Sequence, residues 1–186
     1  MFMVTERLFL RPLWPEDAKT VHEGLANPAV HRNLASTRSP FPLEDAEQKI
    51  AADWAAWPQK ISLGIFLRTD TGPHHVGHIG FGKRPDRDRA IELGYWIAEP
   101  YWGRGIAVEA GRAVLEHAFT AWRLPTLSAG HYTDNPNSGR VLQKLGFRKL
   151  PILRRYFSIP RGEDVICVEY LLTRDEWAGE RMALAA

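Results

Sequence analysis

The stretch that decides the fold runs from Glu92 to Trp122 and reads E-L-G-Y-W-I-A-E-P-Y-W-G-R-G-I-A-V-E-A-G-R-A-V-L-E-H-A-F-T-A-W. Its beginning alternates as a strand does, with the apolar side chains on one face: Ile91, Leu93, Tyr95 and Ile97. Pro100 has no N–H to offer a neighbouring strand, so it ends the pairing. A glycine-containing turn then leads into a helical pattern. The stretch predicts a strand, a turn and a helix N-terminus in succession.

The turn, Trp102 to Ala107, contains two glycines directly before the helix. Such a turn directs several backbone N–H groups at one spot, and the helix dipole adds partial positive charge there. A phosphate or pyrophosphate is the natural occupant. Two glycines before a helix also occur as ordinary turn chemistry, so the turn alone leaves both interpretations open.

Composition limits the classes of protein to consider. With 186 residues, 45% of them hydrophobic, we expect one domain spanning 1–186. The net charge of +2, from 24 basic and 22 acidic side chains, gives no field strong enough to indicate nucleic-acid binding, and we expect no nucleic-acid partner. One cysteine, Cys167, excludes an internal disulfide and a cysteine metal site. Without a signal-peptide pattern or an apolar run that could cross a membrane, we expect a soluble, cytoplasmic protein.

Patterning along the chain predicts alternating groups of strands and helices. Strands are expected at 4–13, 61–68, 75–82, 91–98, 124–132, 148–159 and 164–172. Helices are expected from 14 to 27, 43 to 57, 106 to 122 and 135 to 145, and after the capping box at 173–176. Three tryptophans fit buried helix stripes: Trp54, Trp57 and Trp122. A charged turn is expected at 82–89. The order favours an α+β fold with a mixed, mostly antiparallel sheet flanked by helices.

Four segments, in order, resemble the GNAT superfamily of N-acetyltransferases and specifically its RimJ/RimL-type branch. They are T-E-R-L-F-L-R-P-L, E-L-G-Y-W-I with W-G-R-G-I-A-V-E-A, N-P-N-S-G-R-V-L-Q-K-L-G-F, and Y-L-L-T-R-D-E-W. In the superfamily signature Gly105 and Ala107 match, while Trp102 stands where Gln or Arg is usual. The resemblance implies a GNAT fold and an N-acetyltransferase that uses acetyl-CoA as cosubstrate and no metal. It also implies an amine acceptor, either a small molecule or a protein N-terminus, and a monomer or homodimer.

The resemblance implies a set of coenzyme-binding residues: Ile97, Trp102, Gly103, Arg104, Gly105, Ile106, Ala107, Asn135, Ser138 and Lys144. A backbone N–H near Ile97 would meet the negative charge that develops on the thioester oxygen. Asn135 is also a good N-cap, with Pro136 at the first helical position and Gly146 as the terminator. Lys144 also fits a solvated helix face.

Catalysis would depend on two side chains, Ser138 and Glu92. Many relatives carry a tyrosine that protonates the leaving thiolate, and its place here is Leu142. The branch suggests Ser138 as the substitute, either as an acid or as a hydrogen-bond donor to sulfur. Glu92, on the polar face of the strand, is the candidate base for the amine, directly or through water.

Other titratable residues fit structural roles better. Glu109 in the first turns of the central helix suits the dipole, and Cys167 lies in an apolar strand. The histidines His78, His117 and His131 show no metal-site spacing. Trp96 faces the same way as Glu92 and is a candidate wall of the acceptor site.

Two other functions remain open from the residues. One is a non-catalytic acyl-CoA-binding or sensing domain on the same fold, for which Leu142 in place of tyrosine is the hint. The other is a nucleotide-binding regulator, which is disfavoured because the lysine-serine pair of a P-loop is absent. The acceptor walls would come from 30–44 and 159–164.

Overall fold

The computed structural model describes residues 1–83 and 90–185, so most of the expected charged turn at 82–89 lies outside the described residues. The strands are β1 (Met3–Val4), β2 (Leu8–Arg11), β3 (Ile61–Thr69), β4 (Gly72–Lys83), β5 (Ile91–Ile97), β6 (Thr126–Tyr132), β7 (Arg148–Ser158) and β8 (Glu163–Thr173). The α-helices are α1 (Ala18–Ala26), α2 (Pro28–His31), α3 (Leu43–Ala55), α4 (Ile106–Thr120), α5 (Pro136–Lys144) and α6 (Arg174–Ala185). Two short 3₁₀ turns, η1 (Pro15–Asp17) and η2 (Glu99–Tyr101), precede α1 and the glycine turn.

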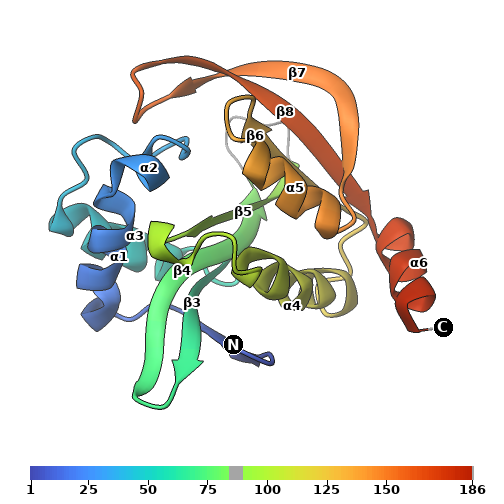
Figure 1. Ribbon diagram of the computed structural model, residues 1–186, viewed down its shortest axis with the longest axis horizontal. Coiled ribbons are helices and arrows are strands. Elements are labelled where there is room, and N and C mark those ends of the chain that lie inside the picture. Colours follow the sequence, from blue (N-terminus) through green and yellow to red (C-terminus); the bar gives the residue numbers. More distant parts are fainter. Residues whose placement is uncertain (84–89, 186) are drawn as a thin grey trace.

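The strands form one sheet in the order β1-β2-β3-β4-β5-β6-β8-β7 (Figure 1). Among the described strands, β5 and β6 pair in parallel and the other neighbours pair antiparallel. Two parallel neighbours need a crossover connection, and α4 provides it. The expected α+β fold with a mixed, mostly antiparallel sheet is confirmed.

Strands β5 and β6 stay together only briefly. A single pair of residues, Glu92 and Ser128, is in register between them. Beyond that pair the two strands diverge toward Ile97 and Tyr132, whereas β4 follows β5 from Lys83 to Gly77. A sheet that opens between two central strands exposes backbone and side chains of both strand ends at one place. This divergence positions the candidate site.

Each face of the sheet has its own apolar core, although the alternation in β5 predicts an apolar face on one side only. Leu93 and Ile97 pack with α4 and α5 on one face. Trp96 packs with α1 and α3 on the other face. Figure 1 shows α1 and α3 on one side of the sheet and α4 on the other. Because β5 contributes side chains to both cores, its position is held from two sides.

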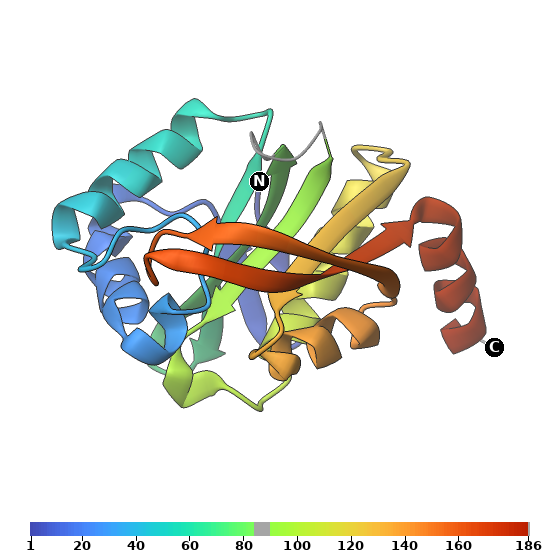
Figure 2. The ribbon, with the colours of Figure 1, turned by 90° about the horizontal axis from the view of Figure 1, so that it is seen from above.

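The β7–β8 hairpin crosses the open side of the sheet and reaches α2 (Figures 1 and 2). At its tip the N–H of Ile159 donates to the carbonyl of Ala35 at 3.1 Å. The Arg161 guanidinium makes two hydrogen bonds to Asp134, at 2.8 and 3.1 Å, and one to the carbonyl of Arg32 at 2.7 Å. These contacts fasten the hairpin to α2 and to the β6–α5 loop.

The expected first strand over 4–13 is wrong, because the structure has two short strands there. The N–H of Leu8 donates to Oγ1 of Thr5 at 3.1 Å, and the N–H of Thr5 donates to the carbonyl of Leu8 at 2.9 Å. This turn folds β1 back on β2, with Met3 opposite Leu10. A side-chain hydrogen bond of this kind competes with extended backbone.

The buried stripe expected for α3 is also wrong in its second half. Ala46 and Ile50 are buried, but Trp54 and Trp57 are 48% and 42% exposed, and the helix ends at Ala55. Trp54 is held at the surface because its indole N–H donates to the carbonyl of Leu13 at 2.7 Å. Trp122 does pack against the core, edge-on to Phe81.

Candidate active site

A cavity of about 520 Å³ opens where β5 and β6 diverge, between the N-termini of α4 and α5. It brings together all but one of the residues predicted for the site: Glu92, Ile97, Trp102, Gly103, Gly105, Ile106, Ala107, Asn135, Ser138 and Lys144. The exception is Arg104, whose guanidinium lies over the Tyr101 ring at 5.4 Å and not on the cavity wall. Residues from separate parts of the sequence thus meet at one opening.

The glycine turn has the backbone that anion binding requires. Gly103 and Gly105 have φ of 74° and 76°, a left-handed conformation that favours glycine. Gly105 is the N-cap residue of α4, so the first N–H groups of that helix face the cavity. A Cβ on Gly105 would find Arg7 Nη2 as its nearest neighbour, at 3.6 Å. The turn therefore leaves space at a helix N-terminus, which suits a pyrophosphate.

The amide of Ile97 faces the opening. The next amide, that of Ala98, donates to the carbonyl of Val76 in β4 at 2.9 Å. Successive amides of a strand point in opposite directions, so the N–H of Ile97 points away from β4 and toward the diverging β6. The carbonyl of Ile97 accepts a hydrogen bond from the Trp102 indole at 2.6 Å, which ties the strand end to the glycine turn.

Helix α5 begins as its sequence predicts. Oδ1 of Asn135 accepts a hydrogen bond from the N–H of Ser138 at 3.4 Å, and Pro136 occupies the first helical position. At the other end Gly146 has φ of 85° and the N–H of Phe147 donates to the carbonyl of Leu142. Asn135 is thus a helix cap that also lines the cavity.

Ser138 has a partner that sequence reasoning missed. The hydroxyls of Tyr95 and Ser138 lie 2.8 Å apart, and the Tyr95 hydroxyl is 3.2 Å from the Ser138 carbonyl oxygen. Both residues line the cavity. Burial raises the pKa of Tyr95 to about 12, although the hydrogen bond to Ser138 opposes that shift. The two residues are 43 positions apart, so no spacing rule could have paired them.

Glu92 lies on the cavity wall, on the sheet face that also carries Trp96. Trp96 lines the same cavity, as predicted for a wall of the acceptor site. Glu109, by contrast, is engaged elsewhere: its carboxylate accepts hydrogen bonds from Thr5 Oγ1 at 2.5 Å and from the Arg7 amide at 2.8 Å. The structural role expected for Glu109 is confirmed, and Glu92 remains the candidate base.

His78 and Cys167 have structural surroundings, whereas His131 lines the cavity. Burial drives the pKa of His78 well below its usual value, and the ring lies 2.7 Å from Ser62 Oγ, away from the cavity. Nδ1 of His131 is 2.7 Å from the Tyr132 carbonyl. Cys167 is buried at the cavity edge, with its sulfur 3.7 Å from the carbonyl oxygen of Val168. Among residues 1–83 and 90–185, no group of three or more such ligands could hold a metal ion.

The far half of the cavity is formed by α2 and by the loop after it, with walls that include Val30, Leu34 and Ala35. Tyr132 joins this wall, because its hydroxyl donates to the carbonyl of Leu34 at 3.0 Å. Ser158, at the end of β7, donates to the same carbonyl at 3.3 Å. The hairpin therefore helps to position the far wall, where the sequence predicted acceptor contacts.

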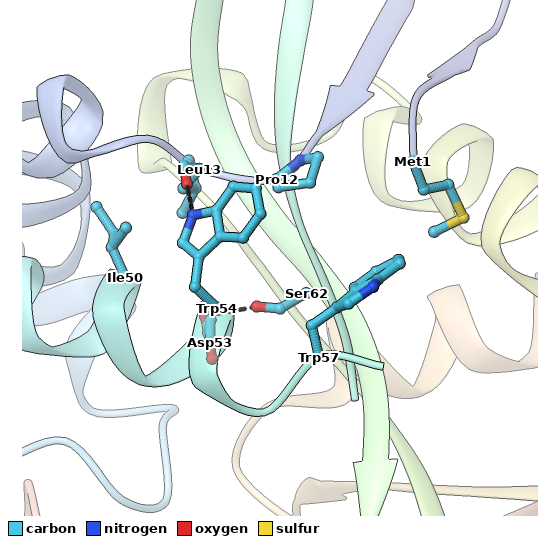
Figure 3. Close-up of a pocket in the computed structure, with 8 residues that line it drawn as sticks. All are labelled: Met1, Pro12, Leu13, Ile50, Asp53, Trp54, Trp57 and Ser62. Atoms are coloured by element: carbon cyan, nitrogen blue, oxygen red, sulfur yellow. Dashed lines mark hydrogen bonds between the residues drawn. The ribbon is translucent and has the colours of Figure 1, made fainter. Parts of the chain in front are cut away.

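A second, smaller cavity of about 170 Å³ lies between α3 and β2 and contains none of the predicted site residues (Figure 3). At its floor Ser62 Oγ donates to Asp53 at 2.5 Å, and Lys49 and Lys60 donate to the same carboxylate at 2.9 and 2.6 Å. The Asp53 carboxylate is thus held by two lysines and a serine hydroxyl, which is a structural arrangement.

The chain is similar to known proteins in sequence and in fold. A family model described as "Acetyltransferase (GNAT) domain" matches residues 7–148. YoaA of Bacillus subtilis (strain 168), described as an uncharacterized N-acetyltransferase, is 31% identical over 154 residues, which is 82% of this chain and 85% of that protein. The ribosomal-protein-serine acetyltransferase of Escherichia coli (strain K12) is 31% identical over 72 residues, 39% of this chain and 40% of that one.

The fold has solved counterparts. Mycobacterium smegmatis RimJ in complex with CoA-disulfide superposes with a TM-score of 0.79 at 24% identity, covering 96% of this chain and 88% of that chain. The chain belongs to the GNAT family of acetyltransferases. It is an N-acetyltransferase enzyme. No helix within residues 1–83 and 90–185 is long and apolar enough to cross a membrane.

Proposed function

We propose that residues 1–186 act as one domain that transfers the acetyl group of acetyl-CoA directly to a primary amine while both substrates are bound. The acceptor class is a small amine or a peptide or protein N-terminus. The observation that carries the proposal is the divergence of β5 from β6, which gathers the glycine turn, Ser138 and Glu92 around one cavity.

The cavity residues fit acetyl-CoA in three respects. The left-handed backbone at Gly103 and Gly105 leaves room for a pyrophosphate at the N-terminus of α4. The N–H of Ile97 points into the opening, where it can bind the thioester oxygen as that oxygen gains negative charge. Lys144, on the α5 side of the cavity, adds positive charge for the phosphates. Acetyl-CoA would supply the activated acetyl group, and the cavity residues would hold its thioester in position for attack by the amine.

Glu92 is proposed to accept the proton of the amine. An ammonium group must lose a proton before its nitrogen can attack a carbonyl carbon, and a carboxylate can take it directly or through one water. Glu92 lies on the acceptor face with Trp96, while Ser138 approaches from α5. The base and the group that meets the sulfur would therefore act from different walls of the cavity.

The test is release of free coenzyme A from acetyl-CoA in the presence of a panel of amines: short peptides with different N-termini, polyamines and free amino acids. We expect at least one class to be acetylated. Acetyl-CoA should also raise the melting temperature, because it binds the folded state only. If millimolar acetyl-CoA shifts no melting curve and calorimetry detects no binding, the proposal is wrong.

A further inference from the structure

The departing sulfur of the coenzyme lacks an acid where many relatives of the family have one. Leu142 occupies that place, and its side chain is buried in the core formed with α4. Nothing at position 142 can donate a hydrogen bond. The structure places another phenol beside the cavity: Tyr95 reaches from β5 to within 2.8 Å of the Ser138 hydroxyl.

We propose that Tyr95 is a positioning residue for Ser138: its phenol donates to Ser138 Oγ, and this turns the serine proton toward the coenzyme sulfur. The inference rests on the proposed function for the place of the sulfur. Tyr95 acts through the serine, and Ser138 is the group that touches the substrate.

A count of donors and acceptors supports this orientation. A tyrosine hydroxyl has one proton, and a serine hydroxyl has one proton and two acceptor sites. The Tyr95 oxygen has two acceptors within reach, Ser138 Oγ at 2.8 Å and the Ser138 carbonyl at 3.2 Å. The carbonyl lies inside α5 and accepts the helical hydrogen bond four residues on. Oγ is both nearer and less occupied. When Tyr95 donates to it, the serine proton is left for another acceptor.

Tyr95 is suited to be a permanent donor and unsuited to be the acid. Burial raises its pKa to about 12, so the phenol keeps its proton throughout the neutral range. A free thiol has a pKa of about 8.5, so proton transfer from such a phenol to a thiolate is unfavourable by roughly a thousandfold. A chain of two hydroxyls still strengthens its last hydrogen bond, because each donor polarises the next. The thiolate would therefore leave hydrogen-bonded and not protonated.

The chain offers a matched comparison. Tyr170 is another tyrosine near the first turn of α5, since a Cβ on Gly139 would lie 3.1 Å from its hydroxyl, and it is buried. That hydroxyl lies 3.4 Å from His131 Nε2, so its hydrogen-bond partner is the histidine and not Ser138. Tyr170 also does not line the cavity. Removing its hydroxyl should leave the sulfur environment unchanged.

The first test needs no acceptor and no turnover. The ultraviolet absorbance of the thiolate gives the pKa of the coenzyme A thiol bound to the protein, and a hydrogen bond from Ser138 should lower that pKa. We expect Tyr95→Phe and Ser138→Ala each to raise it by about one unit, a tenfold change in ionisation. The double variant should show no further rise. Tyr170→Phe should match the wild type.

The second test uses the rate. In single-turnover acetyl transfer, Tyr95→Phe should lower the rate about tenfold with the affinity for acetyl-CoA unchanged, because the hydrogen bond strengthens as charge develops on sulfur. In the Ser138→Ala background Tyr95→Phe should cost nothing more, since the pair acts as a unit. Equal losses in both backgrounds, or an unchanged thiol pKa in Tyr95→Phe, would overturn the inference.

Two controls keep the outcomes separate. If Tyr95→Phe lowers the melting temperature, a fluorotyrosine at position 95 keeps the shape while making the phenol a stronger donor, and the bound thiol pKa should then fall below that of the wild type. A rise would contradict the inference. If the wild type acetylates no amine but the thiol pKa responds as expected, the proposed function is wrong and the Tyr95–Ser138 relationship stands.

Discussion

The carboxylate of Glu109, in the first turn of α4, accepts a hydrogen bond from Nε of Arg7 at 2.7 Å. The same guanidinium donates through Nη1 to the carbonyl of Arg104 at 3.0 Å, inside the glycine turn. The loop between β1 and β2 therefore holds the backbone of the proposed pyrophosphate site from behind. The contact links the N-terminal hairpin to the glycine turn although neither Arg7 nor Glu109 lines the cavity.

Arg7→Ala should weaken acetyl-CoA binding about fivefold, equivalent to about 1 kcal/mol for a partly exposed ion-pair network. The reason is that the glycine turn loses its support, so binding must order it. Calorimetric titration measures the effect. Arg148→Ala, which removes the ion pair of Arg148 with Glu176, is the control and should not change the affinity. If the wild type, Arg7→Ala and Arg148→Ala bind acetyl-CoA with equal affinity, the glycine turn keeps its conformation without Arg7.

Gly105→Val should abolish coenzyme binding while the protein stays folded. A residue with a Cβ at φ of 76° carries strain of roughly 1–2 kcal/mol, and its branched side chain crowds the Arg7 guanidinium, 3.6 Å from that Cβ, which supports the glycine turn. Gly162→Val carries similar strain at φ of 65° in the β7–β8 turn, with open space around its Cβ. That variant should lose stability but keep binding. If Gly105→Val binds acetyl-CoA normally, the pyrophosphate does not bind at the glycine turn.

Glu92→Gln should lower turnover by about tenfold to a thousandfold without changing the affinity for acetyl-CoA. The loss should shrink as pH rises, because more of the amine is already deprotonated and needs no base. The pH profile of kcat/KM for the variant and the wild type measures this. Glu47→Gln, on the exposed face of α3 and outside the predicted acceptor walls, should follow the wild-type profile. A loss that is uniform across pH would assign Glu92 to positioning the acceptor.

Arg161→Ala should raise KM for the amine and leave the acetyl-CoA affinity unchanged. The guanidinium holds Asp134 and the Arg32 carbonyl, and its charge lies over the Tyr132 ring at 4.8 Å, so its loss frees the acceptor wall and not the glycine turn. Arg148→Ala removes another paired arginine, bound to Glu176 and outside the predicted acceptor walls, and serves as the control. If Arg161→Ala lowers the affinity for acetyl-CoA as well as for the amine, the two substrates do not depend on separate walls of the cavity, and the prediction is wrong.

Acidification should destabilise the protein through His75. Burial lowers the pKa of His75 to about 4, against an attraction from Asp17 that would raise it. Below about pH 6.5, the usual pKa of histidine, His75 is protonated in the unfolded chain but stays neutral in the folded protein. The free energy of unfolding is therefore unaffected by His75 above about pH 6.5 and decreases from there toward pH 4. The fall is at most about 1.4 kcal/mol per pH unit for this one group. Melting temperatures recorded across that range measure it.

His75→Phe should flatten this pH dependence, because the ring keeps its contacts with Phe66 and Trp96 but has no proton to gain. His74→Phe changes the exposed neighbouring histidine and is the matched control. The same slope in both variants would show that other groups cause the loss. His78, whose pKa burial also holds far below its usual value, contributes in the same direction and remains in both variants.

The sequence by itself predicted the local backbone features around the cavity. The strand that ends at Ile97, the two glycines before α4 and the Asn135 cap were all predicted, and so was the capping box, in which Thr173 and Glu176 exchange hydrogen bonds. Each of these depends on residues within a few positions of one another. Proline, glycine and capping side chains act on their own backbone, so their effect is visible without a fold.

The tertiary structure alone decided what meets across the chain. The Tyr95–Ser138 pair joins a strand to a helix 43 residues later, and the Arg7 contact with Glu109 spans 102 residues. The exposure of Trp54 and Trp57 depends on where α3 ends and on which surface lies beside it, since helical spacing shows a stripe but not what covers it. The divergence of β5 from β6, which makes the cavity, is likewise a relation between strands that their separate patterns do not contain.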